Sequence, residues 1–317
     1  MPNFALVGAA GFVAPRHMQA IADTGNQLVA AVDPHDSVGV IDRYFPDAAF
    51  FTEVERFDRF LEKRRRLGEA ERVHYISICS PNYLHDAHVR LALRVGAHAI
   101  CEKPLVISPW NLDQLAALSA EYERKVYAVV QLRCLPQLRE LAAKLHAGPR
   151  AKADVELTYV TARGRWYAQS WKGAPEKSGG LALNIGVHLF DLLIWLYGKP
   201  ASSQVTLARA DKMAGVFELE HARVRWFLSI DREDLPDAVQ AQGKTAFRSL
   251  VADCQEIEFS DGHGDLHTAV YRDILAGGGH TIEDVRPALE LAHQIRLAPI
   301  ETVPDVHPLV RREGSPG

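Results

Sequence analysis

Hydrophobic positions in the first 130 residues form short apolar runs that alternate with amphipathic stretches. The runs predict strands at residues 3–8, 27–33, 49–51, 73–77, 98–101 and 126–130. The amphipathic stretches predict helices at residues 14–23, 36–44, 53–67, 83–95 and 109–124. Strands that alternate with helices indicate a parallel sheet with right-handed crossovers.

After about residue 150 the pattern changes to runs of strands with few helices between them. Strands are expected at residues 154–161, 203–208, 216–220, 223–231, 249–252 and 255–259, and helices at residues 181–197 and 282–297. The sequence therefore predicts an α/β protein of two domains. Residues 1–130 would form a doubly wound parallel sheet, and residues 131–317 an α+β domain with a large, mostly antiparallel sheet.

Composition and charge restrict the possible functions. The 317 residues are 47% hydrophobic and 24% charged, as expected for globular domains. A net charge of −4 does not suit a protein that grips the phosphates of nucleic acid. No apolar run approaches the roughly 20 residues of a membrane-spanning helix, so no membrane partner is expected. Four widely spaced cysteines without a signal-peptide pattern favour free thiols in the cytoplasm.

The turn after the first predicted strand could hold a dinucleotide. Residues 8–14 read GAAGFVA, which is not a strict G-x-G-x-x-G. Gly11 and Ala14 can serve as the second and third small positions, with Ala9 or Gly8 near the first. Small residues there let the backbone approach a pyrophosphate at the start of the helix. By itself, a small-residue turn is more often only a turn.

Asp33 strengthens the case for a cofactor. It ends the second strand, 22 residues after Gly11, close to the spacing of about 20 residues for an acid that binds ribose hydroxyls. A carboxylate there would repel the extra phosphate of NADP, so NAD is expected. The alternative is an ordinary turn acid before Pro34. Residues 80–85 and 102–104 also follow strands, which places them on the ligand-binding edge of a parallel sheet.

Three motifs together resemble the glucose-fructose oxidoreductase/inositol dehydrogenase/MocA (Gfo/Idh/MocA) family. They are residues 80–85 (SPNYLH), 102–104 (EKP) and 184–191 (NIGVHLFD). The resemblance covers nearly the whole chain. It implies a Rossmann domain followed by an open-faced sheet used in oligomerisation. The chain has Asn184 where most members have aspartate, and its glycine turn is one residue longer than usual.

Four further segments resemble one dehydrogenase subgroup of this family, which shares both departures. They are residues 8–17, 163–167, 170–173 and 265–268. The subgroup oxidises the C3 hydroxyl of a UDP-linked N-acetylglucosaminuronate in bacterial surface-polysaccharide synthesis. The resemblance implies NAD and a UDP-sugar uronate substrate. A homotetramer is expected because the sheet of the strand-rich second half must cover an exposed face. It leaves open whether NADH is released or is reoxidised in place by a 2-oxo acid such as 2-oxoglutarate.

The resemblance also implies site residues. The expected cofactor-binding residues are Gly11, Phe12, Val13, Asp33, Ser80, Asn82, His85, Glu102, Lys103, Gln131 and Trp171. The expected substrate-binding residues are Lys103, Arg163, Tyr167, Lys172, Asn184 and His188. Arginine suits carboxylates and phosphates because its fork can bind in two places. For Trp166 and Trp171, packing in a core or an interface is an equal alternative to stacking on the ligand.

Lys103 and His188 are the expected catalytic residues. Oxidation of a secondary alcohol needs a hydride acceptor and a base for the hydroxyl proton. A lysine beside a cationic nicotinamide has its neutral form favoured, and histidine has an unperturbed pKa of about 6.5. We favour His188 as the base and Lys103 as the group that orients the hydroxyl, although the reverse is also possible. Without the family motifs, a lysine after a strand is more often a surface residue, and a histidine on an apolar helix is more often a satisfied core residue.

No metal is expected from the sequence. Two histidine clusters lack companion ligands at a metal spacing: His85 with His88, and His263 with Asp265 and His267. His267 and Tyr271 are expected to line the substrate pocket or to pack under it.

Two other functions compete with the favoured one. The first is oxidation of another sugar, polyol or nucleotide sugar by the same chemistry. The second is a non-catalytic NAD-binding sensor, against which the presence of both Lys103 and His188 argues.

Overall fold

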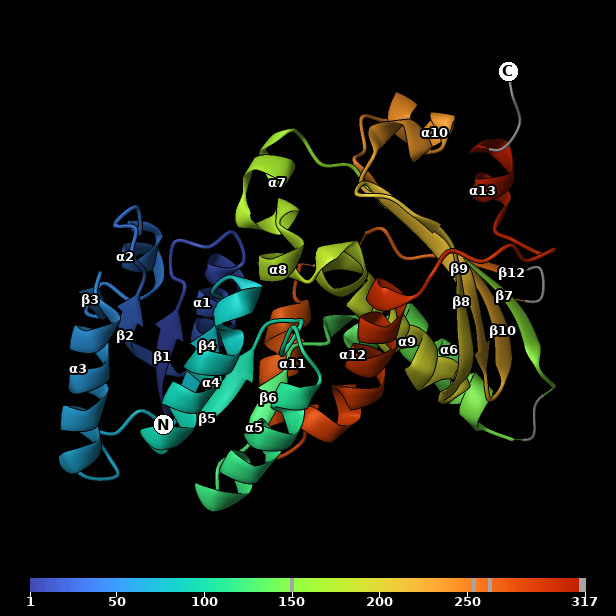
Figure 1. Ribbon diagram of the computed structural model, residues 1–317. Coiled ribbons are helices and arrows are strands. Elements are labelled where there is room, and N and C mark those ends of the chain that lie inside the picture. Colours follow the sequence, from blue (N-terminus) through green and yellow to red (C-terminus); the bar gives the residue numbers. More distant parts are fainter. Residues whose placement is uncertain (149–150, 253–254, 262–263, 314–317) are drawn as a thin grey trace. The chain divides into compact units, whose positions relative to one another are not determined.

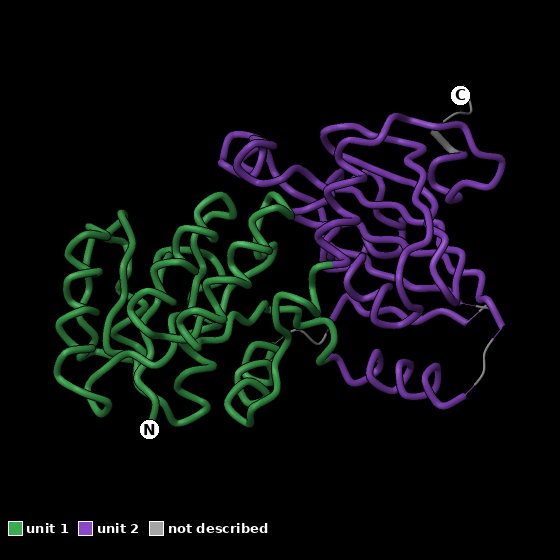
Figure 2. The backbone as a smooth tube through the Cα atoms, turned by 60° about the horizontal axis from the view of Figure 1, so that its bottom comes forward, with its two compact units in different colours: residues 1–134, 264–286 green, residues 135–263, 287–317 purple. Residues whose placement is uncertain are grey.

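The computed structural model describes residues 1–148, 151–252, 255–261 and 264–313 (Figure 1). By packing, the chain divides into two compact units (Figure 2). Unit 1 comprises Met1–Cys134 and Gly264–Arg286, and unit 2 comprises Leu135–His263 and Pro287–Gly317. The expected domains were 1–130 and 131–317, without the return of residues 264–286 to the first unit.

Unit 1 is built on a six-stranded parallel sheet with the order β3-β2-β1-β4-β5-β6. Its strands are β1 (Asn3–Val7), β2 (Gln27–Val32), β3 (Ala49–Phe51), β4 (Tyr75–Ile78), β5 (His98–Cys101) and β6 (Val126–Ala128). This is the strand order of a Rossmann fold, which reverses between β1 and β4. The predicted doubly wound sheet is confirmed, and the carboxyl ends of its strands lie along one edge.

The helices of unit 1 lie close to their predicted positions in the first 130 residues. They are α1 (Ala14–Asp23), α2 (Val40–Tyr44), α3 (Val54–Arg66), α4 (His85–Arg94) and α5 (Trp110–Glu121). Short 3₁₀ turns follow β4 and β6, at Asn82–Leu84 and Gln131–Cys134. The core joins strands to helices through Phe4, Leu6, Met18 and Ile21, all fully buried.

Helix α11 (Leu266–Leu275) was not predicted, although it belongs to unit 1. Its buried residues Leu266, Val270, Tyr271 and Ile274 recur with helical spacing, which is the signal that could have found it. The helix packs against α1. The segment after it joins the edge of the sheet, where the Ala128 N–H donates to the carbonyl oxygen of residue 280 at 2.8 Å.

Unit 2 contains a second six-stranded sheet, in the order β12-β11-β7-β10-β9-β8. Its strands are β7 (Ala153–Thr161), β8 (Pro200–Ala208), β9 (Lys212–Leu219), β10 (Ala222–Ser229), β11 (Ala246–Ala252) and β12 (Gln255–Glu258). Only the β7–β10 pair is parallel within this described sheet, and the other neighbours are antiparallel. The predicted mostly antiparallel sheet is therefore confirmed.

One face of this sheet is covered by α9 (Val187–Tyr197), which follows a π-helical turn at Ala182–Gly186. Phe190 on α9 meets the rings of Phe217 and Trp226 edge-on, with centroids 5.2 and 5.5 Å away. The sequence predicted a single helix over residues 181–197. The remaining described helical segments after residue 135 are α6 (Pro136–His146), α7 (Trp166–Gln169), 3₁₀ Trp171–Gly173, α8 (Pro175–Ser178), 3₁₀ Arg232–Asp234, α10 (Asp237–Ala241), α12 (Ile282–Leu297) and α13 (Pro308–Glu313).

Two expectations about the chain as a whole can be compared with the structure. The helical stretch Pro175–Tyr197 is long and apolar enough to cross a membrane, which the apolar runs of the sequence did not predict. However, 78% of its apolar window is buried inside the fold, which is typical of a core helix. Cys79, Cys101 and Cys134 carry free thiols, as expected, and Cys254 lies outside the described residues.

Candidate active site

The glycine turn after β1 lies directly against the end of β4. Gly8 has a φ of +87°, and a Cβ atom added there would lie 2.6 Å from the backbone nitrogen of Ser80. Gly11 is also confined, because its Cβ would lie 3.0 Å from the Gly8 carbonyl oxygen. Gly8 therefore fills the first small position, which the sequence left open between Gly8 and Ala9. Any larger residue at position 8 would collide with the backbone of Cys79 and Ser80, so the close approach of the turn to β4 requires glycine there.

Asp33 is held beside this turn at the end of β2. Its side chain is buried, and its two carboxylate oxygens accept hydrogen bonds from the N–H groups of Ala10 and His35, both at 2.9 Å. The bond from His35 is the turn interaction of an ordinary acid before Pro34. An ordinary turn acid would not need the hydrogen bond from Ala10. This bond fixes the Asp33 carboxylate beside the glycine turn. That is where a ribose-binding acid of a Rossmann fold lies.

The motif residues after β4 are mostly buried. Ser80 forms a hydrogen bond with His88 Nδ1 at 2.8 Å, and Asn82 is 5% exposed. His85 is buried as well, with Nε2 2.8 Å from the Ser80 carbonyl oxygen and Nδ1 2.7 Å from the Pro104 carbonyl oxygen. Burial lowers the pKa of His85, against the effect of these two carbonyl oxygens. His85 thus connects the segments after β4 and β5, and its predicted role in cofactor binding would act through that connection.

Other expected cofactor residues differ in exposure. Phe12 is 88% exposed on the glycine turn, and Val13 is half-buried. Gln131, just after β6, has a buried Oε1 atom with no hydrogen-bond partner in the described part of the chain. An orphaned acceptor at the ligand-binding edge, together with the small-residue turn at Gly8, fits a dinucleotide that supplies the missing contacts.

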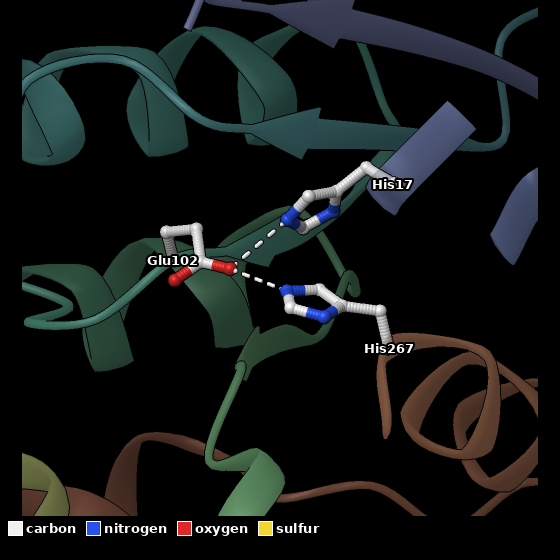
Figure 3. A group of neighbouring side chains, drawn as sticks. All are labelled: His17, Glu102 and His267. Atoms are coloured by element: carbon white, nitrogen blue, oxygen red, sulfur yellow. Dashed lines mark hydrogen bonds and ion pairs between the residues drawn. The ribbon is translucent and has the colours of Figure 1, made fainter. Parts of the chain in front are cut away.

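Glu102 is the residue directly after β5, and its side chain lies at the centre of a buried polar group (Figure 3). Its Oε1 atom lies 3.0 Å from His17 Nε2 and 2.9 Å from His267 Nε2. His17 Nδ1 lies 2.8 Å from the Tyr271 hydroxyl, which also contacts the Ser77 hydroxyl. His267 and Tyr271 are 2% and 0% exposed, so they pack beneath the surface of unit 1.

This group was not visible in the sequence because its members come from α1, the end of β5 and α11. His17, Glu102 and His267 offer ligand atoms within 4.8 Å of one another, the composition of a possible metal site. Of the two histidine clusters considered from sequence, only His267 belongs to this group. His85 and His88 have the partners described above, and His263 lies outside the described residues.

Burial and hydrogen bonding shift the pKa of Glu102 in opposite directions. Burial raises the pKa of its carboxyl, but the hydrogen bonds from His17 and His267 outweigh burial and hold the pKa well below its usual range. Burial lowers the pKa of His17, although the bond to Glu102 opposes this. At neutral pH unit 1 therefore holds an ionised carboxylate at the end of β5, next to Lys103.

Unit 2 brings together two of the expected substrate-binding residues. Asn184 Nδ2 donates to the Tyr167 hydroxyl at 2.7 Å, and both side chains are buried. Burial raises the pKa of Tyr167, and the bond from Asn184 opposes this. Asn184 lies in the π-helical turn, which is wider than an α-helical turn, so its relation to His188 is not the simple one-turn spacing that the sequence suggested. Such turns are frequent at functional sites.

His188 differs from its neighbours in burial. Among residues 181–193, it is the only one that is not buried, since the other polar residues of this stretch, Asn184 and Asp191, are buried. A core histidine would be buried like the residues around it. Its partial exposure within unit 2 favours the predicted functional role.

Lys172 lies over two aromatic rings in the segment that was expected to bind substrate. Its Nζ atom is 4.9 Å from the ring centroid of Trp166 and 5.5 Å from that of Trp171. Burial lowers the pKa of Lys172, and the nearby Arg163 lowers it further. Trp166 is 52% exposed and Trp171 is half-buried, so neither is a core residue of unit 2. The segment presents cationic and aromatic groups together.

Two segments of the chain match models of one protein family. Residues 2–130 match the model of an oxidoreductase family's NAD-binding Rossmann fold, and residues 151–234 match that family's C-terminal alpha/beta domain. A crystal structure of the WlbA (WbpB) dehydrogenase from Thermus thermophilus, in complex with NAD and alpha-ketoglutarate, shares 48% sequence identity. The match covers 98% of this chain and 100% of that one, with a TM-score of 0.94. A second crystal structure of that dehydrogenase contains NAD and UDP-GlcNAcA.

More distant relatives share the fold. The WlbA dehydrogenase from Bordetella pertussis is 18% identical over 93% of this chain and 95% of that chain, with a TM-score of 0.76. Among curated proteins, the D-glucoside 3-dehydrogenase of Escherichia coli (strain K12) is 21% identical. That match covers 65% of this chain and 66% of the relative, so it spans just under two thirds of its length.

Replacing Gly8 tests the close approach of the glycine turn to the end of β4. In Gly8→Ala, the added methyl group would meet the backbone of Ser80 in a strained conformation, at a cost of about 1–3 kcal/mol. We expect a lower melting temperature and an NAD affinity reduced at least ~10-fold, measured by calorimetry. Gly39→Ala is the matched control, because its φ is −54° and its Cβ would meet open space. Wild-type NAD affinity in Gly8→Ala would contradict a role of this close approach in NAD binding.

Asp33 is expected to select NAD over NADP by charge repulsion. In Asp33→Ala, the ratio of the two dissociation constants should fall at least ~10-fold, mainly through tighter NADP binding, because about 1.4 kcal/mol of repulsion is removed. Calorimetric titrations with both cofactors measure this ratio. Asp47→Ala, which removes an exposed carboxylate elsewhere in unit 1, should leave it unchanged. Equal affinities of the wild-type protein for NAD and NADP would refute the assignment.

Proposed function

The chain belongs to the Gfo/Idh/MocA family of NAD-dependent oxidoreductases, and on that premise we propose that it oxidises the C3 hydroxyl of UDP-N-acetyl-2-amino-2-deoxy-D-glucuronate to the 3-keto sugar. The observation that carries the proposal is the 48% identity, over 98% of this chain and 100% of the other, to a Thermus dehydrogenase whose crystal structure holds NAD and UDP-GlcNAcA. Bound NAD supplies the hydride acceptor for this chemistry.

The residues of this chain supply the proton chemistry. We assign His188 as the base that takes the hydroxyl proton, since imidazole accepts a proton near neutral pH. We assign Lys103 to orient the same hydroxyl and to stabilise the negative charge that develops on its oxygen. Lys103 follows β5 on the cofactor edge of unit 1, and His188 is the half-buried polar residue of α9. The opposite assignment of the two roles uses the same pair.

The substrate-binding residues match the chemistry of a UDP-sugar uronate. Asn184 and Tyr167 form a neutral, buried polar pair that can hydrogen-bond sugar hydroxyls without adding charge. Arg163 and Lys172 can pair with a carboxylate or a diphosphate. Trp166 and Trp171 offer ring faces for a uracil or a sugar. A pocket for an uncharged polyol would not need the two cations.

The proposal extends to reoxidation, location and assembly. We propose that 2-oxoglutarate reoxidises the bound NADH in place, which the alpha-ketoglutarate in the Thermus crystal structure supports. We also propose a cytoplasmic homotetramer that serves bacterial surface-polysaccharide synthesis. The free thiols support the compartment. The strand-rich sheet of unit 2, which the family resemblance links to oligomerisation, supports the assembly.

Titration of the purified protein with UDP-GlcNAcA, while the absorbance of NADH is followed, tests the function. The proposal expects reduction of NAD that saturates with this sugar and that 2-oxoglutarate reverses. If only another sugar or a polyol were turned over, the substrate assignment would be wrong, and the protein would be a dehydrogenase of that other substrate. Binding of NAD without turnover of any sugar would favour a sensor.

Variants of the catalytic pair test the assigned roles. Lys103→Ala and His188→Ala should each lose about 10²–10⁴-fold in turnover, the usual cost of removing a general base. NAD affinity and melting temperature should stay close to wild type. The controls Lys63→Ala and His146→Ala remove exposed residues of the same types and should not change turnover. Near wild-type turnover would refute that residue's assignment, and simple unfolding would favour a core role.

Light scattering tests the assembly. We expect a mass of about four chains of 35.2 kDa at micromolar concentration. A monomer would refute the homotetramer.

A further inference from the structure

Lys103 is held between two buried anchors in unit 1. Glu102, Pro104 and Leu105 are buried, whereas Lys103 is half-buried. On one side, Glu102 is bonded to α1 and α11 through His17 and His267. On the other side, His85 from α4 lies 2.7 Å from the Pro104 carbonyl oxygen. Three helices remote from one another in the sequence therefore fix the backbone on which Lys103 stands.

Glu102 also contacts Lys103 directly. The backbone N–H of Lys103 donates a hydrogen bond to Glu102 Oε2 at 3.3 Å, while Glu102 Oε1 accepts hydrogen bonds from His17 and His267. The two carboxylate oxygens thus have different partners. One faces the helices and the other faces the Lys103 backbone, so the orientation of the carboxylate depends on His17 and His267.

The hydrogen bonds assign a tautomer to His17. Burial lowers its pKa, so the ring is neutral and has one N–H group. Because Glu102 is ionised and can only accept, His17 Nε2 donates to it. His17 Nδ1 then accepts from the Tyr271 hydroxyl, and that oxygen accepts from Ser77. One chain of hydrogen bonds therefore runs from Ser77 through Tyr271 and His17 to Glu102. Each hydroxyl and the single His17 N–H donates one hydrogen bond along it.

Hydrogen bonding explains this group better than a metal ion. Both Nε2 atoms lie at hydrogen-bond distance from the same oxygen, Glu102 Oε1. A histidine that binds a metal almost always donates its other N–H to a partner. His267 Nδ1 is buried and has no hydrogen-bond partner in the part of the chain that the structure describes. As a metal ligand, His267 would leave that N–H unsatisfied.

We infer that His17 and His267 are positioning residues for Lys103, acting through the buried carboxylate of Glu102. The two histidines keep Glu102 charged and oriented. Glu102 in turn fixes the Lys103 backbone and adds a permanent negative charge next to the lysine. The inference rests on the proposed role of Lys103 in catalysis, but its physical content concerns the ionisation of Lys103 and can be measured without a substrate.

The direct test measures the reactivity of Lys103 itself. The holoprotein with NAD is labelled by a trace amine-reactive anhydride across pH 6–11, and labelling of each lysine is read by peptide mass spectrometry. A neighbouring negative charge favours protonated lysine, so its removal in Glu102→Gln should move the labelling midpoint of Lys103 to lower pH. At a fixed pH below the midpoint, labelling of Lys103 should rise ~3–10-fold.

Two controls isolate the effect. Glu62→Gln removes a half-buried carboxylate of α3 with the same change of net charge, and it should leave Lys103 unchanged. Lys144 is the internal reference, since it is exposed on α6, far in sequence from every substituted residue, and should label identically in all variants.

Variants of His267 test the step before Glu102. His267→Leu removes the donor, so Glu102 is held less firmly and its charge is less favoured, and labelling of Lys103 should shift in the same direction as in Glu102→Gln. His267→Gln keeps an N–H donor and should restore most of the wild-type midpoint. The same order is expected for His17→Leu and His17→Gln. If the His17 variants do not fold, the His267 pair decides alone.

Three outcomes would overturn the inference. Unchanged labelling of Lys103 in folded Glu102→Gln, with only a lower melting temperature, would show a merely structural group. Equal midpoints for His267→Leu and wild type would remove the histidines from the positioning role. One equivalent of a divalent transition metal that copurifies with the wild type and is lost in His267→Leu would show a metal centre instead.

The test separates this inference from the proposed function. If UDP-GlcNAcA is not turned over but the labelling of Lys103 shifts as expected, the positioning role stands and the substrate assignment fails. If the sugar is turned over without any shift in labelling, the substrate assignment stands and the positioning role is wrong.

Discussion

A charged group buried at the end of a strand is the constraint around which unit 1 is organised. An unpaired carboxylate in a protein interior is unfavourable by several kcal/mol, so Glu102 needs donors. These donors are His17 on α1 and His267 on α11, two helices that are far apart in sequence. The packing of α11 against α1 is therefore tied to the polar chemistry beside β5, as well as to the apolar residues that α11 buries.

The same edge of the sheet carries the features that fit a dinucleotide. Gly8 allows the first turn to approach Ser80, Asp33 is fixed beside that turn, and Gln131 offers an unsatisfied acceptor after β6. The parallel arrangement of the strands brings them together, because the ends of β1, β2, β4, β5 and β6 lie along one edge. Selection of the cofactor and placement of Lys103 thus use the same part of the fold.

Unit 2 uses a local irregularity for its chemistry. The π-helical turn before α9 carries Asn184, whose bond to Tyr167 links this turn to the segment with Trp166 and Lys172. The rest of α9 is packed against the aromatic side chains of β9 and β10. This mostly apolar helix thereby carries one half-buried polar residue, His188.

The sequence by itself determined the local features of this protein. Alternation of apolar runs and helical patterns predicted the Rossmann sheet, and the acid at position 33 indicated NAD, because both signals depend on residues near one another in the chain. The π-helical turn, the anchoring role of His85 and the group formed by His17, Glu102 and His267 were decided only by the tertiary structure. Their partners are up to 165 residues apart, and no sequence period encodes such separations. The physical reason is that a buried charge must find its donors wherever the packed helices bring them.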